Sequence, residues 1–155
     1  MRIAIVVLSL WTVANVALTA RAVSRDDSRT TAIRSSGTSA DGRTAVPLPI
    51  EARDAVLAEM RLMLGAVNGV LAGAAQSDTM AIREAAAAAG LVMAADPALE
   101  AILPKGFLQY GMATHRAFDS LAANASAGPA AAIQSLAAIT ETCVTCHAAY
   151  RLELQ

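Results

Sequence analysis

From residue 50 onward, apolar residues recur at spacings of three and four, the spacing at which side chains share one face of a helix. The repeat predicts four helices, which cover about residues 50–76, 79–94, 106–124 and 129–153. No segment shows the two-residue alternation that is typical of a half-buried strand. Four helices with short connections predict an all-α fold, an antiparallel four-helix bundle over residues 50–155.

The first part of the chain has a different pattern. A basic start, Met1-Arg2, precedes eighteen uncharged residues, 3–20, as in an export signal. This stretch is long for a signal core and just reaches the roughly 17–25 residues that span a bilayer. Ala20-Arg21-Ala22 fits a cleavage site between small residues. Residues 1–22 are therefore interpreted either as a cleaved signal peptide or as a membrane anchor.

The segment that follows, residues 23–49, is rich in Ser, Thr, Arg, Asp and Gly and has no apolar repeat. Such a composition predicts a flexible linker. With an export segment before it, we expect the bundle in the periplasm. It is either soluble after signal cleavage or tethered to the inner membrane by residues 3–20, and contact with the membrane is expected only through this segment.

Composition adds one expectation and excludes two classes of protein. The chain is 55% hydrophobic but only 3% aromatic, and alanine supplies much of the apolar content. Small side chains fill little volume, so the core is expected to depend on a bulky group that the sequence does not encode. The apolar content excludes a disordered chain. A net charge of −1 and a single lysine, Lys105, exclude a nucleic-acid binder, which needs a basic patch.

The chemistry of the chain is concentrated in Cys143-Val144-Thr145-Cys146-His147. Cys-x-x-Cys-His is the attachment signature of c-type haem. Each thiol adds to one of two vinyl groups on adjacent edges of the porphyrin. Residues i, i+3 and i+4 share a helix face, so Cys143 and Cys146 can hold the ring while His147 reaches the iron. The motif predicts one covalent haem c.

Three other interpretations were weighed. A disulfide between Cys143 and Cys146 suits an exported protein but leaves the adjacent histidine unexplained. A thioredoxin-like redox motif needs a strand-to-helix context, which the pattern does not offer. A zinc site needs about four ligands and would have to recruit His115. That histidine lies off the apolar stripe of its helix, which predicts a surface or boundary position.

Cys143, Cys146 and His147, followed by Tyr150 and Arg151, lie near the C-terminal end of the last predicted helix. In this arrangement the chain resembles the class II cytochromes c, the cytochrome c′ group, over about residues 50–154. The resemblance implies a bundle with haem near one end, commonly in a homodimer. The family includes six-coordinate electron carriers and five-coordinate proteins that bind small gases, so it implies no single function.

The second axial iron ligand is expected from the start of the first helix, which lies beside the end of the last helix in an antiparallel bundle. Met60 and Met63 both lie on its core face, and a thioether is a usual partner of a His-ligated haem. At 1.5 Å per residue, His147 lies about 9 Å from a helix end near Glu153, and Met60 and Met63 about 15 and 20 Å from Ile50. Met60 is the nearer match and Met63 the alternative; both can also be ordinary core residues.

Arg151 follows His147 by one helical turn. Its guanidinium is a candidate contact for a haem propionate, and a cation is also favourable at a helix C-terminus without any ligand.

These residues predict a periplasmic haem protein that carries single electrons between redox partner proteins. The alternative is a five-coordinate haem that binds nitric oxide or carbon monoxide. We do not expect an enzyme, because no nucleophile–base pair or polar distal group is evident beside the motif. From residue 50 the chain carries six basic and ten acidic side chains, a net charge of about −4, which favours a partner with a basic patch.

Overall fold

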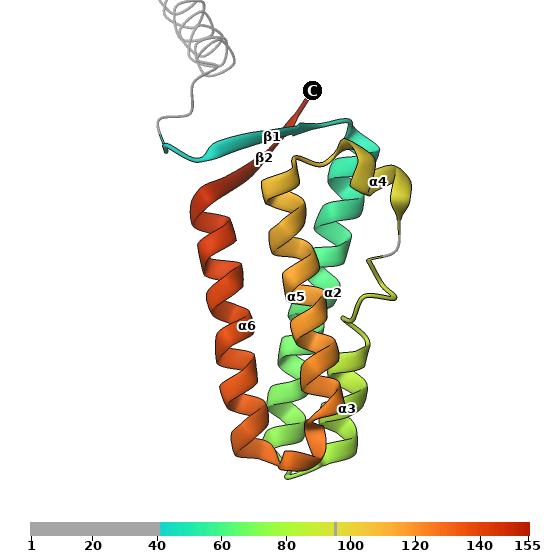
Figure 1. The fold of residues 1–155 in the computed structure, drawn as a ribbon, viewed down its shortest axis with the longest axis vertical. Coiled ribbons are helices and arrows are strands. Elements are labelled where there is room, and N and C mark those ends of the chain that lie inside the picture. The colour runs from blue at the N-terminus through green and yellow to red at the C-terminus, as the bar shows by residue number, and fades with distance from the viewer. Residues whose placement is uncertain (1–40, 95) are drawn as a thin grey trace, which may run out of the picture. The chain divides into compact units, whose positions relative to one another are not determined.

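The computed structural model describes residues 41–94 and 96–155 and is mostly helical there, which confirms the predicted helical class (Figure 1). In chain order the elements are β1 (Thr44–Leu48), α2 (Ile50–Ala75), α3 (Thr79–Ala87), α4 (Pro97–Ile102), α5 (Lys105–Ala123), a 3₁₀ turn (Ala125–Ala127), α6 (Pro129–Ala149) and β2 (Tyr150–Leu154). The predicted signal or anchor, residues 1–22, and the linker up to residue 40 lie outside the described residues.

The helix starts follow from local chemistry. Asp78 caps α3, where its Oδ1 accepts hydrogen bonds from the backbone N–H groups of Met80 and Ala81 at 3.0 and 2.9 Å. Asp96 caps α4 in the same way, and Pro129 occupies the first turn of α6, where its missing N–H is not needed. The starts of α3 and α6 lie where the sequence pattern expects helices to begin, whereas α4 lies in a segment that was expected to be a connector.

The second helix ends earlier than predicted. It was expected to reach about residue 94, but α3 ends at Ala87 and residues 91–94 form turns. Gly90 lies against Asp119 of α5, so closely that an added Cβ would meet the carboxylate. The Asp119 Oδ2 accepts the backbone N–H of Leu91 at 3.1 Å. The carboxylate of Asp119 thus accepts the Leu91 N–H, which would otherwise have donated within a longer α3.

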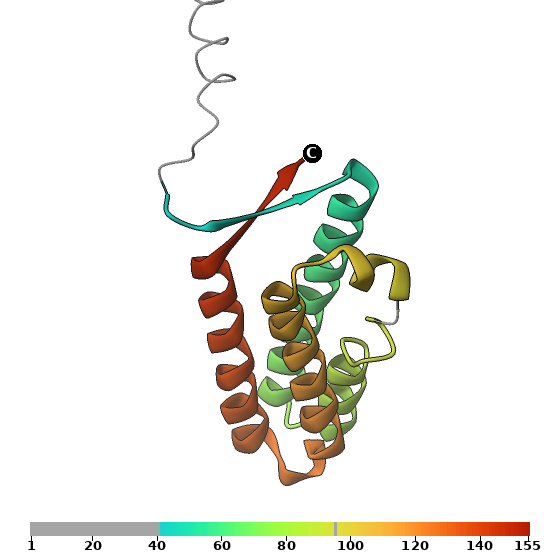
Figure 2. The same ribbon diagram turned by 45° about the horizontal axis from the view of Figure 1, so that its top comes forward.

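Two short strands contradict the expectation that the chain contains no strand. β1 pairs with β2 in parallel, with Val46 opposite Leu152. Val46 and Leu48 point inward and are fully buried, while Pro47 between them is exposed. The prediction of a flexible linker up to residue 49 and of a helix to Glu153 is therefore wrong for these two segments. Figure 2 shows both strands crossing the end of the helices at which α2 begins and α6 ends.

The helices enclose two separate apolar clusters. The larger, which we call the packed end, has fully buried residues from α2, α3 and α5, such as Val70, Ile82 and Phe118. The smaller, which we call the cavity end, lies under the two strands around Val46, Leu48, Val56 and Phe107. At the packed end α2 and α3 approach so closely that a Cβ added to Gly69 would lie only 2.7 Å from the Cβ of Ala85. Small residues there permit tight packing.

Among the described helices, α2 is long and apolar enough to cross a membrane by length and composition alone. A buried helix of a soluble protein or a signal sequence can meet the same criterion, so this is weak evidence for a membrane segment. In this structure α2 packs against α3 and α6.

Candidate functional site

A cavity of about 510 Å³ opens at the cavity end and is bordered by residues of α2, α4, α5 and α6. Its size lies within the range of about 300–1,000 Å³ that is usual for small-molecule and cofactor sites. Most of its wall is aliphatic, aromatic or thioether in character. The ionisable and sulfur-containing side chains on its border are Glu59, Met60, Arg61, Met63, Asp96, Glu100, Tyr110, Met112, His115, Cys143, Cys146 and His147.

The motif residues lie on the last two turns of α6, and all three border this cavity. Cys143 and Cys146 are half-buried free thiols, and His147 is more exposed. The carbonyl oxygen of His147 accepts a hydrogen bond from Arg43 Nη1 at 3.4 Å. The helical spacing thus does what the sequence predicts, since it brings two thiols and one imidazole to the same opening.

Burial raises the pKa of both thiols above the usual value. For Cys146, the charge of Cys143 raises the pKa further, whereas a backbone hydrogen bond at Cys143 partly offsets the effect of burial. The thiols are therefore protonated at neutral pH. Redox-active Cys-x-x-Cys sites have lowered thiol pKa values, so the environment counts against the thioredoxin-like interpretation.

The structure places both candidate thioethers of α2 along the cavity but in different clusters. Met60 packs against the cavity-end cluster, as Cys146 does, whereas Met63 packs against the packed end. Of the two methionines, Met60 is thus the one that shares a cluster with a motif residue. The helix that carries the motif ends at Ala149 rather than near Glu153, so His147 lies only about 3 Å from its end at 1.5 Å per residue.

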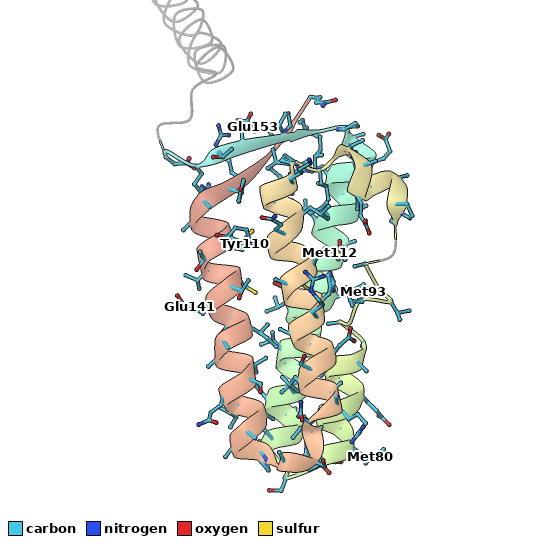
Figure 3. All side chains as sticks on the ribbon, in the orientation of Figure 1. Met80, Met93, Tyr110, Met112, Glu141 and Glu153 are labelled. Carbon is cyan, nitrogen blue, oxygen red and sulfur yellow. The ribbon has the colours of Figure 1, made fainter. Side chains whose placement is uncertain are left out.

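Aromatic rings pack together beside the cavity, which Phe107 and Tyr110 border. The ring of Tyr150 meets Phe107 edge-on, with centroids 5.6 Å apart, and meets Tyr110 at 6.1 Å. Figure 3 shows Tyr110 in the space between α5 and α6, with Met112 on the other side of α5. A Cβ on Gly106 would lie 2.5 Å from the Tyr150 hydroxyl, so glycine permits this ring to approach α5.

The arginine expected one helical turn beyond His147 is not on a helix. Arg151 belongs to β2, where it pairs with Glu153, and the residues that border the cavity include Arg61 instead. Arg61 is exposed and lies on α2, immediately after Met60. It is a second candidate for pairing with a propionate, and the sequence analysis missed it because charge alone does not show which face of a helix borders a cavity.

His115 is buried, with 1% of its side chain exposed, so the surface or boundary position expected for it is wrong. Its Nδ1 donates to the carbonyl oxygen of Ala89 at 2.7 Å, and its Nε2 lies 2.6 Å from Glu59 Oε1. Burial lowers the pKa of His115, but the hydrogen bonds to Glu59 and Ala89 and the charges of Glu59 and Asp119 raise it by more. The pKa of His115 is therefore raised above its usual value, and its side chain is hydrogen-bonded to Glu59.

Glu59 was not singled out by sequence reasoning. The sequence does contain a signal that could have identified it: Glu59 is the one carboxylate within the apolar stripe that Val56, Met60 and Met63 form on one helix. A charge at such a position predicts a buried partner, but the sequence does not say which one.

The hydrogen bonds of His115 also bear on the zinc interpretation, which needs this histidine as a ligand. Among residues 41–94 and 96–155, no three His, Cys, Asp or Glu side chains come together as a metal-binding group. Both ring nitrogens of His115 are already engaged by Ala89 and Glu59. Recruiting it to a metal would break the pair.

Comparison with known proteins adds nothing to this picture: no protein-family model, curated protein or solved structure matches the chain.

Proposed function

We propose that the chain is an electron-carrying cytochrome with one covalent haem c, held in an antiparallel bundle of α2, α3, α5 and α6. The observation that carries the proposal is the common border of one cavity: two thiols, the adjacent imidazole and the thioether of Met60 all line it. Such a donor set matches His–Met ligation of a c-type haem.

The residues around the cavity fit the group. Cys143 and Cys146, protonated and three residues apart on one helix face, would form the two thioether links, and His147 and Met60 would be the axial ligands. When bound, the haem takes up and releases single electrons. The chain's own part is to hold the ring between α2, α5 and α6, to keep water away with apolar and aromatic walls, and to favour the reduced state through the thioether.

Export of the chain by residues 1–22 would place the protein in the periplasm, either free or tethered, and its acidic balance from residue 50 onward favours redox partners with a basic patch. Homodimerisation remains what the class II resemblance implies.

Gas binding is the second candidate, and one observation favours it. Because α6 ends at Ala149, His147 lies about 3 Å from the helix end, while Val56 lies about 9 Å and Met60 about 15 Å from the start of α2. Val56 is buried in the cavity-end cluster. If the iron lies level with Val56, an aliphatic side chain faces it, and the sixth position is open to nitric oxide or carbon monoxide.

The visible spectrum of the exported protein separates the two candidates. A low-spin, six-coordinate spectrum that becomes high-spin in Met60→Ala supports the carrier, because that variant removes the proposed sulfur ligand while alanine keeps the helix. Met112→Ala is the matched control and Met63→Ala tests the alternative ligand, since both methionines border the same cavity. A high-spin, five-coordinate parent that binds carbon monoxide supports the gas-binding alternative. A low-spin parent that all three variants leave unchanged would contradict methionine ligation.

A further inference from the structure

The Glu59–His115 pair ties together three parts of the molecule beside the cavity. His115 comes from α5 and Glu59 from α2, and Ala89 lies just after the end of α3. A carbonyl oxygen only accepts hydrogen bonds, so Nδ1 carries a proton towards Ala89 and Nε2 faces the carboxylate. Both nitrogens are engaged, which leaves His115 no free lone pair for an iron.

The pair acts on a segment of α2 in which Met60 and Met63 are only partly buried. The buried residues of this helix are Val56 and then Ala66, Val70, Gly73 and Ala74. Over the nine residues from 57 to 65, α2 thus has no fully buried side chain and borders the cavity. Glu59 lies in this segment, immediately before Met60, and its side chain is 24% exposed at the contact with His115.

The connector behind His115 is itself fixed to α5. Asp119, one helical turn after His115, accepts the backbone N–H of Leu91, two residues beyond the carbonyl that His115 binds. The imidazole therefore lies between a carbonyl that α5 holds in place and a carboxylate on α2. A hydrogen bond of 2.6 Å restrains the rotation of α2 about its own axis at Glu59, and the next residue on the helix is Met60.

We propose that the Glu59–His115 pair is a positioning device for the axial thioether, which holds α2 so that Met60 points into the cavity. The inference rests on the proposed haem ligation and adds the residues that set its geometry. Neither member of the pair touches the iron. Loss of the Glu59–His115 pair is expected to leave the haem attached but to weaken the bond between the Met60 sulfur and the iron, because Met60 is no longer held toward the cavity.

The test compares Glu59→Ala and His115→Ala with the conservative Glu59→Gln in the exported, haem-loaded protein. Both alanine variants should lose low-spin absorbance, bind carbon monoxide more readily in the ferrous form and have a lower reduction potential than the parent. Glu59→Gln keeps a side chain that can hydrogen bond to His115, and it should retain most of the low-spin spectrum. Glu84→Ala removes an exposed carboxylate from α3 and serves as the control for charge.

A second readout does not depend on haem. Amide hydrogen exchange of residues 57–65 should be faster in Glu59→Ala than in Glu59→Gln, while residues 66–74 exchange alike in both. If Glu59→Ala keeps the parental spin state, potential and exchange rates, the positioning role is wrong. If it lowers only the unfolding stability, the pair is structural and the proposal is also overturned.

Failure of the proposed function has a different signature. The ligation itself is contradicted if the parent protein carries no covalent haem, or if Met60→Ala leaves its visible spectrum unchanged. If amide hydrogen exchange at residues 57–65 is still faster in Glu59→Ala, the pair orders α2 but does not position an axial ligand. This result would also overturn the positioning role.

Discussion

The two ends of the described domain are built from the same kinds of helix but packed in different ways. At the packed end, small residues let α2 and α3 approach until Gly69 nearly touches Ala85, and Ile82 and Phe118 are fully enclosed. At the cavity end, the same helix α2 borders an opening of about 510 Å³, and Leu64 remains 68% exposed. The chain thus fills one core with its own side chains and leaves a cavity beside the other.

The largest expected difference between the two ends is in how much the free energy of unfolding falls when an apolar side chain is shortened to alanine. Ile82→Ala should lower the free energy of unfolding by about 2–5 kcal/mol, because it leaves a cavity among fully buried residues. Leu64→Ala should change it by no more than about 0.5 kcal/mol in the haem-free chain, since the side chain is mostly exposed. Chemical unfolding of both variants measures this. Equal costs would contradict the contrast between the ends.

An intermediate change in unfolding free energy is expected at the cavity end, where Tyr150 packs against α5. Gly106→Ala should cost about 1–3 kcal/mol, since the added methyl overlaps the Tyr150 hydroxyl and forces the ring to move. Gly65→Ala is the matched control, because a Cβ there meets nothing within 4 Å, and alanine in a helix stabilises by about 0.5–1 kcal/mol relative to glycine. Thermal unfolding compares the two. A stabilising Gly106→Ala would show that Tyr150 is not packed against α5.

The smallest expected effect is the pH dependence that the buried histidine adds. The pKa of His115 is higher in the folded than in the unfolded chain, so the folded state binds more protons. Its contribution to stability is complete below a pH of about 6.5 and is lost as the pH rises through the folded pKa. The difference in unfolding free energy between the parent and His115→Gln should therefore shrink with rising pH. A difference that grows with pH would mean that burial, not Glu59, dominates.

Much of the helical layout could be predicted because its causes are local. Apolar spacing and the residues Pro49, Asp78 and Pro129 mark helix starts within a few positions of those observed. The ends of α3 and α6 could not be predicted, since Asp119 and the β1 strand determine them from far along the chain. Five-residue strands, one of which contains Pro47, carry too short a pattern to be told from linker or helix.

The candidate site divides in the same way. Cys143, Cys146 and His147 are found by spacing alone, because one helix carries all three. The Glu59–His115 pair joins residues 56 positions apart in the sequence. His115 is buried between the connector after α3 and Glu59 of α2, on the side of α5 that the helical pattern marks as polar. Pairing of this kind depends on tertiary structure and leaves no periodic signal.

The haem attachment itself is tested most directly by extraction of the exported full-length chain with acidified acetone. We expect the haem absorbance to stay with the precipitated protein, and a Cys143→Ala, Cys146→Ala double variant to retain none of it. Haem that passes into the acetone from the parent protein, or a parent that carries no haem when it is produced with the haem-attachment machinery, would contradict the assignment of this cavity to a covalently bound haem c.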